Sequence, residues 1–134
     1  MDTSAACRLR LRATPDAPRR AREALAGFSG GLTELEVAEL MLLTSELVNN
    51  AILHPRHPRD DSEIELVAER TSSGLRVEVR DHDAESMPVV RSDSPLSESG
   101  MGLRVVQTLA TDWGSHVLPS GVGKAVWFEY ATST

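Results

Sequence analysis

The chain has 134 residues, the size of one ordinary domain with a single hydrophobic core. Its net charge of -6, from 14 basic and 20 acidic residues, disfavours general binding to nucleic acid or to an anionic membrane. The only cysteine, Cys7, excludes an internal disulfide and a cysteine-based metal cluster. No apolar run approaches the roughly 20 residues that span a bilayer. We therefore expect one cytoplasmic domain over residues 1–134, without membrane or direct nucleic-acid contacts.

The N-terminal half predicts one strand and two helices. Apolar and polar side chains alternate over residues 7–12, which indicates a strand after a frayed start at residues 1–6. Helix-start prolines and apolar residues at helical spacing then predict a short helix over residues 17–28. Thr33 and Glu36 form a capping box that begins a long helix. This helix must end near His54, because the following proline disfavours helical geometry in the residue before it.

The C-terminal half predicts four strands, a lid and a third helix. Residues 63–69 and 75–80 alternate like the two strands of an antiparallel hairpin. Residues from about 82 to 100 lose all periodicity, which favours a functional lid. A helix then begins at Gly100, and two strands follow at its C-terminal side, over residues 113–118 and 124–130. This order predicts an α/β (α+β) two-layer sandwich, with a mixed, mostly antiparallel sheet of about five strands and three helices on one face.

Three polar residues lie along one face of the long helix. Glu46, Asn50 and His54 recur at intervals of four within an otherwise apolar run, so their side chains align. Polar groups arranged in this way usually serve a ligand. The alternative is an amphipathic helix whose polar side faces water.

Two further motifs follow along the chain. Asp81 ends the second strand of the hairpin, and Gly100-Met101-Gly102-Leu103 begins the third helix. The start of a helix directs amide hydrogens and a positive dipole end toward phosphate. A lone Gly-x-Gly is more often an ordinary helix-entry turn. Its place after a long lid favours the phosphate interpretation here.

In this order the motifs resemble those of the GHKL superfamily of ATP-binding domains, which includes gyrase, heat-shock chaperones, histidine kinases and mismatch-repair ATPases. Within it, the chain looks like the small standalone actinobacterial proteins related to anti-sigma-factor serine/threonine kinases. The resemblance extends from Ala17 to Tyr130, and its most specific parts are residues 45–54, 77–81, 100–103 and 123–128. It implies the GHKL (Bergerat) ATP-binding fold.

The resemblance implies ATP and Mg²⁺ as ligands and a role for each motif. Asn50 would hold Mg²⁺ through its carboxamide oxygen, a hard neutral ligand. Glu46 would orient or deprotonate the attacking hydroxyl. Asp81 would accept the exocyclic amino group of adenine. His54 would bind phosphate or cap the helix end, and the helix dipole alone also explains a cation there. Phosphate would meet the backbone of Gly100, Met101, Gly102 and Leu103.

The chain departs from the family pattern at two places. The second motif normally continues as Asp-x-Gly-x-Gly, whereas Asp81 is followed by His82, Asp83, Ala84 and Glu85. In the last strand, Ala125 stands where relatives commonly have a threonine that supports the adenine-binding aspartate through water. Both departures are expected to weaken ATP binding.

The resulting prediction is an ATP/Mg-binding regulator of transcription with serine/threonine kinase activity. It would phosphorylate an antagonist (anti-anti-sigma) protein and bind a sigma factor, and homodimer formation stays open. The alternative is a non-catalytic nucleotide-sensing or nucleotide-free module that binds a partner protein, which the two departures favour. A detached histidine-kinase catalytic domain is less expected, because no helix with an acceptor histidine precedes the domain.

Overall fold

Five strands and three helices form within the residues that the computed structural model describes, which are 6–28, 30–53, 63–81, 98–119 and 123–133. In chain order they are β1 (Ala6–Arg12), α1 (Ala17–Ala26), α2 (Glu34–Leu53), β2 (Glu63–Arg70), β3 (Gly74–Asp81), α3 (Glu98–Leu109), β4 (Asp112–Val117) and β5 (Lys124–Ala131). None of the helices in this described part is both long and apolar enough to cross a membrane. The order of these strands and helices along the chain confirms the order predicted from the sequence.

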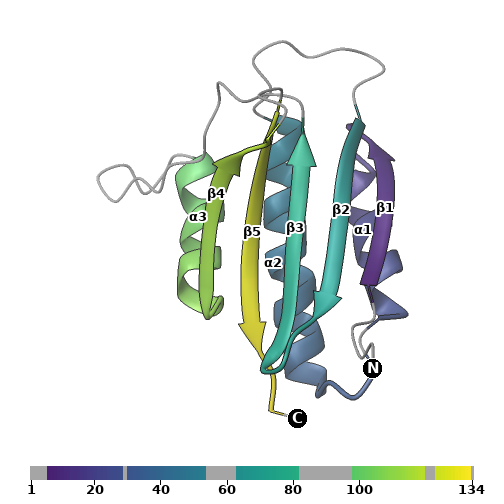
Figure 1. Cartoon of the computed structure of the whole chain (residues 1–134), viewed down its shortest axis with the longest axis vertical. Helices are drawn as coiled ribbons and strands as arrows, with labels where there is room; N and C mark the ends of the chain where they lie inside the picture. The colour runs from purple at the N-terminus through teal and green to yellow at the C-terminus, as the bar shows by residue number, and fades with distance from the viewer. Residues whose placement is uncertain (1–5, 29, 54–62, 82–97, 120–122, 134) are drawn as a thin grey trace.

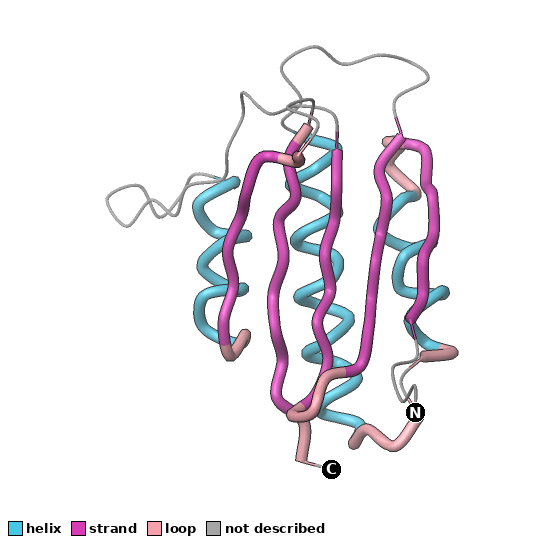
Figure 2. Tube along the Cα trace, in the orientation of Figure 1, coloured by secondary structure: helices cyan, strands magenta, loops and turns pink. Residues whose placement is uncertain are grey.

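The strands form one open sheet in the order β1-β2-β3-β5-β4. All three helices cover the same face of this sheet, so the expected two-layer architecture is confirmed (Figures 1 and 2). The expectation of a mixed sheet is replaced by a sheet in which every neighbouring pair is antiparallel. The reason is the position of β5. Strands β3 and β4 run in the same direction, as a helical crossover requires, but β5 lies between them and pairs with both.

Alternation along the strands gives the sheet one apolar and one charged face. Every second side chain, such as Leu66 of β2 and Val77 of β3, belongs to the core beneath the helices. The other face carries a series of ion pairs, Arg8–Glu65, Arg80–Glu65, Arg80–Glu78 and Arg76–Glu78. Any polar group that points to the helix-covered face therefore needs a partner inside the core.

Helix α2 begins with the capping box that the sequence predicts. The backbone N–H of Thr33 donates to Oε1 of Glu36 at 2.9 Å, and the N–H of Glu36 donates to Oγ1 of Thr33 at 3.1 Å. The backbone N–H of Ser133 also donates to Oε2 of Glu36 at 2.6 Å. The hydrogen bonds from Thr33 and Ser133 hold the pKa of the Glu36 carboxyl below its usual value. One side chain thus joins the start of α2 to the C-terminal segment.

Replacing Thr33 with alanine should lower the free energy of unfolding by about 1 kcal/mol, because the N–H of Glu36 loses its side-chain acceptor. Urea-induced unfolding followed by circular dichroism measures this change. Thr33→Ser is the matched control, since it keeps the hydroxyl and should retain most of the stability. Equal losses in both variants would contradict a capping role for the hydroxyl.

Candidate functional site

Four segments that are distant in sequence meet at one end of the molecule. The C-terminal end of β3, the first residue of β5, the C-terminal turns of α2 and the N-terminus of α3 all lie at the upper end in Figure 1. The fold therefore brings Asp81, the polar face of α2 and the start of α3 to the same region. His54, which follows α2, lies outside the described residues.

Helix α2 carries Glu46 and Asn50 in its C-terminal half, one turn apart. The helix is held by Leu47 and Val48, which are fully buried on its core side. Glu46 and Asn50 are both half-buried, so neither behaves as a freely solvated surface group. Burial raises the pKa of the Glu46 carboxyl above its ordinary value. A carboxylate in this setting is a stronger base than one in water, which suits proton abstraction from a hydroxyl.

Asp81 has a buried ionic partner that the sequence interpretation missed. It is the last residue of β3 and lies opposite Lys124, the first residue of β5. Nζ of Lys124 is 2.9 Å from Oδ2 of Asp81, and their side chains are only 2% and 8% exposed. The signal for this partner was present in the last strand. Lys124 is in phase with the core residues Val126 and Phe128, and a lysine at an inward position requires a counter-ion.

The structure corrects the expected role of residue 125. Ala125 lies opposite Arg80, not Asp81, and adjacent strand positions point to opposite faces of a sheet. A side chain at position 125 therefore points away from Asp81. The residue beside the carboxylate is Lys124, so the absence of a hydroxyl at position 125 does not leave Asp81 unsupported.

The third helix begins two residues earlier than the sequence indicates. Helix α3 starts at Glu98, so the glycines at 100 and 102 lie within its first turns and not in a loop before it. Glu98 favours this earlier start, because an acidic residue complements the dipole at a helix N-terminus. The amides at the start of a helix have no acceptor within it, and here they include that of Gly100, whereas that of Met101 is the first in the hydrogen-bonded part. The amides of Gly102 and Leu103 fall in the hydrogen-bonded part. The remainder of the expected lid, residues 82–97, lies outside the described residues.

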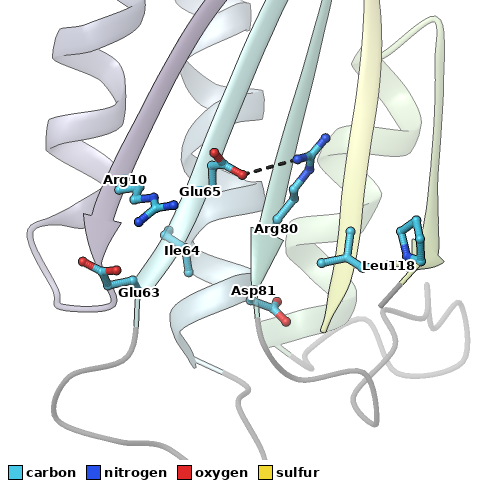
Figure 3. A pocket seen from close by; sticks show the side chains of 8 residues that line it. Arg10, Glu63, Ile64, Glu65, Arg80, Asp81 and Leu118 are labelled. Carbon is cyan, nitrogen blue, oxygen red and sulfur yellow. Dashed lines mark hydrogen bonds and ion pairs between the residues drawn. The ribbon is translucent and has the colours of Figure 1, made fainter. Parts of the chain in front are cut away.

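A cavity of about 390 Å³ opens beside Asp81, within the size range of small-ligand pockets. Figure 3 shows its charged side chains arranged over the strands, with Arg80 and Glu65 joined by an ion pair of 3.3 Å. Asp81 lies at its lower edge in this view. The described lining residues are Arg10, Glu63, Ile64, Glu65, Arg80, Asp81, Leu118 and Pro119. Apart from Asp81, these charged residues belong to the face of the sheet away from the helices, so the cavity lies on the opposite side of the sheet from Glu46 and Asn50, neither of which lines it.

Comparisons with known proteins agree with this architecture. Residues 11–130 match the family described as the histidine kinase-like ATPase domain. The crystal structure of the RsbU and RsbW domains of Rv1364c from Mycobacterium tuberculosis is similar over 97% of this chain, with a TM-score of 0.61 and 18% sequence identity. The match covers 33% of that chain, so the chain spans about a third of its length, and at this identity the likeness shows the fold alone. No curated protein sequence matches.

The family match extends over most of the chain, through both strands of the central hairpin, all three helices and most of β5. It includes Glu46 and Asn50 of α2 and Asp81 at the end of β3. The chain therefore belongs to the family of histidine kinase-like ATPase domains, which implies a site for ATP.

Proposed function

We propose that the chain is a cytoplasmic regulator that transfers the γ-phosphate of Mg-ATP to a serine or threonine of an antagonist protein. The observation that carries the proposal is the half-buried Glu46, whose raised pKa makes it a suitable base, one turn from Asn50 on the same helix. Both belong to the C-terminal half of α2, which ends in the region where β3 ends and α3 begins. This arrangement supplies base, phosphate and purine contacts in one region.

The expected partners are the antagonist protein and a sigma factor. Two findings support this class of regulator: the sequence motifs resemble those of anti-sigma-factor serine/threonine kinases, and the fold is similar to a structure that contains an RsbW domain. The family match supports ATP as the phosphoryl donor. Sigma-factor binding would link the phosphorylation state of the antagonist to transcription.

The residues on α2 fit a bound Mg²⁺ ion. Asn50 offers a neutral carboxamide oxygen, a hard donor of the kind that Mg²⁺ prefers, one turn from the carboxylate of Glu46. Asn50 would hold the ion. Bound Mg²⁺ would neutralise charge on the phosphate oxygens.

The remaining chemistry belongs to the chain's own residues. Glu46 accepts the proton of the serine or threonine hydroxyl while the hydroxyl oxygen bonds to the γ-phosphorus. The bond from that phosphorus to the oxygen that bridges it to the β-phosphate breaks, and ADP is released. The unpaired amides at the start of α3 orient the phosphates. Asp81 accepts a hydrogen bond from the exocyclic amino group of adenine. Positioning and charge stabilisation supply most of the rate in such a site.

Calorimetric titration with Mg-ATP tests the proposal directly. We expect one site per chain, with binding weakened at least about tenfold by Asn50→Ala, since a charge-assisted contact is lost. Asn49→Ala is the matched control, because it removes the neighbouring carboxamide and should leave the affinity unchanged. At 100 times its dissociation constant, ATP should add about 2.7 kcal/mol to the free energy of unfolding. No binding at millimolar Mg-ATP would contradict the proposed function.

A protein-binding module without chemistry is the second candidate. It is favoured by the ion pair between Asp81 and Lys124, which satisfies the base-reading carboxylate from within the chain. The sequence after Asp81 also lacks the two glycines of the family motif. Capture of an antagonist protein with equal affinity in the presence and absence of Mg-ATP, without phosphorylation, is the result that this second candidate predicts.

A further inference from the structure

The ion pair between Asp81 and Lys124 changes what the base-reading carboxylate can do. Both side chains are almost fully buried, with Nζ and Oδ2 separated by 2.9 Å. Removing one partner of a buried pair leaves an uncompensated charge in a medium of low dielectric constant, which is strongly unfavourable. A hydrogen bond from the neutral amino group of a purine returns much less free energy. A purine therefore cannot displace the ammonium group, and the pair persists when the base binds.

The two partners are not equivalent in position. Asp81 is the more exposed of the two, at 8% against 2% for Lys124, and it is the last residue of β3, at the end of the sheet. Lys124, the first inward-facing residue of β5, thus meets the carboxylate from the neighbouring strand. A carboxylate has two oxygens and about four lone-pair sites, so the bond from Lys124 to Oδ2 uses only part of its acceptor capacity.

We propose that Lys124 is the positioning residue of the base-reading carboxylate. Its ammonium group holds Oδ2 from the neighbouring strand, fixes the side-chain conformation of Asp81 and supplies the counter-charge that a buried carboxylate needs. The carboxylate is then presented in ionised form to the exocyclic amino group of the purine. This inference rests on the proposed binding of ATP.

The position of Lys124 in the strand supports this role. The residue precedes Val126 and Phe128 in the inward-facing series of β5, where a long cationic side chain is costly without its partner. Opposite placement in the antiparallel register brings its backbone beside that of Asp81. Lys124 is also the only lysine of the chain, whose other basic residues are arginines. A single amine signal therefore reports on this contact.

A ligand comparison tests the positioning role. ATP and purine riboside 5′-triphosphate differ only in the exocyclic amino group, so the ratio of their dissociation constants isolates its contact. In the wild-type chain we expect ATP to bind about tenfold or more tightly, as for a hydrogen bond to a charged group. Lys124→Met should reduce this ratio to about one, while the affinity for purine riboside triphosphate changes by less than about threefold.

A cation on the other face of the sheet provides the control. Arg76→Met removes a cation from the opposite face of the sheet and should leave the ratio unchanged. Equal weakening of both ligands by Lys124→Met would assign Lys124 a structural role only and overturn the inference. Failure of the wild-type chain to bind either triphosphate would instead contradict the proposed function and remove the inference with it.

A second measurement uses the wild-type chain and does not depend on folding of the variant. Labelling with ¹⁵N-lysine gives one Nζ resonance, because Lys124 is the only lysine. We expect this resonance to be visible through slow hydrogen exchange and to persist at saturating Mg-ATP. Its disappearance on ATP binding would show that the base releases Lys124 from Asp81, which would overturn the inference.

Discussion

Replacing Glu46 with glutamine is expected to slow phosphoryl transfer by about 10²–10⁴-fold, the usual contribution of a general base. The affinity for Mg-ATP should change little, because glutamine keeps the shape and hydrogen-bonding capacity of the side chain. Single-turnover transfer from labelled ATP to the antagonist protein measures the rate separately from binding. Glu34→Gln, an exposed acid in the first turn of the same helix, is the matched control and should be as active as the wild-type chain.

The raised pKa of Glu46 gives this variant a second signature in stability. Because burial raises the pKa in the folded state, the folded chain binds the proton more tightly than the unfolded chain. Ionisation of Glu46 as the pH rises therefore costs folded stability. Without nucleotide, Glu46→Gln should unfold at the same or a higher urea concentration than the wild-type chain at pH 7. The difference should vanish below about pH 4, where Glu46 of the wild-type chain is protonated and therefore as neutral as the glutamine. A less stable variant at pH 7 with unchanged transfer rate would contradict the assigned role.

Replacing Lys124 with methionine is expected to lower the free energy of unfolding by about 3–5 kcal/mol at neutral pH. The variant keeps the volume of the side chain but leaves the carboxylate of Asp81 without its counter-charge in the core. Urea-induced unfolding measures the loss.

The double variant Asp81→Asn with Lys124→Met provides the control. It removes both charges, so no buried ion is left alone, and it should be more stable than Lys124→Met. The energy of interaction between the two positions follows from the complete cycle with Asp81→Asn. If the two single losses simply add in the double variant, the ion pair contributes nothing that either residue does not contribute alone.

The local elements were predictable because their signals are local. Thr33 and Glu36 predict the start of α2 from their spacing, and the structure has both hydrogen bonds. The position of β5 between β3 and β4 was not predictable in the same way, because sheet order depends on contacts between residues far apart in the chain. The glycines predict the start of α3 two residues too late, because Glu98 and Ser99 also favour a helix N-terminus.

In the candidate site, too, local spacing predicts some residues, whereas others depend on how distant strands pair. The spacing of Glu46 and Asn50 on one helix follows from the helical period alone, and α2 carries both as predicted. Lys124 was missed because its significance depends on the register between β3 and β5, which places it beside Asp81. Residue 125 was chosen from the family pattern, but the alternation of the strand turns it to the other face. The proposed roles of Glu46, Asn50 and Asp81 stay predictions.

A crystal structure of the chain with Mg²⁺ and a non-hydrolysable ATP analogue tests the central claim most directly. We predict that Asp81 accepts a hydrogen bond from the exocyclic amino group of adenine while its Oδ2 stays paired with Lys124. The carboxamide oxygen of Asn50 should contact the metal. Glu46 should face the γ-phosphate. A nucleotide bound instead over the charged face of the sheet, between Arg10 and Arg80 and away from Asn50, would contradict the account.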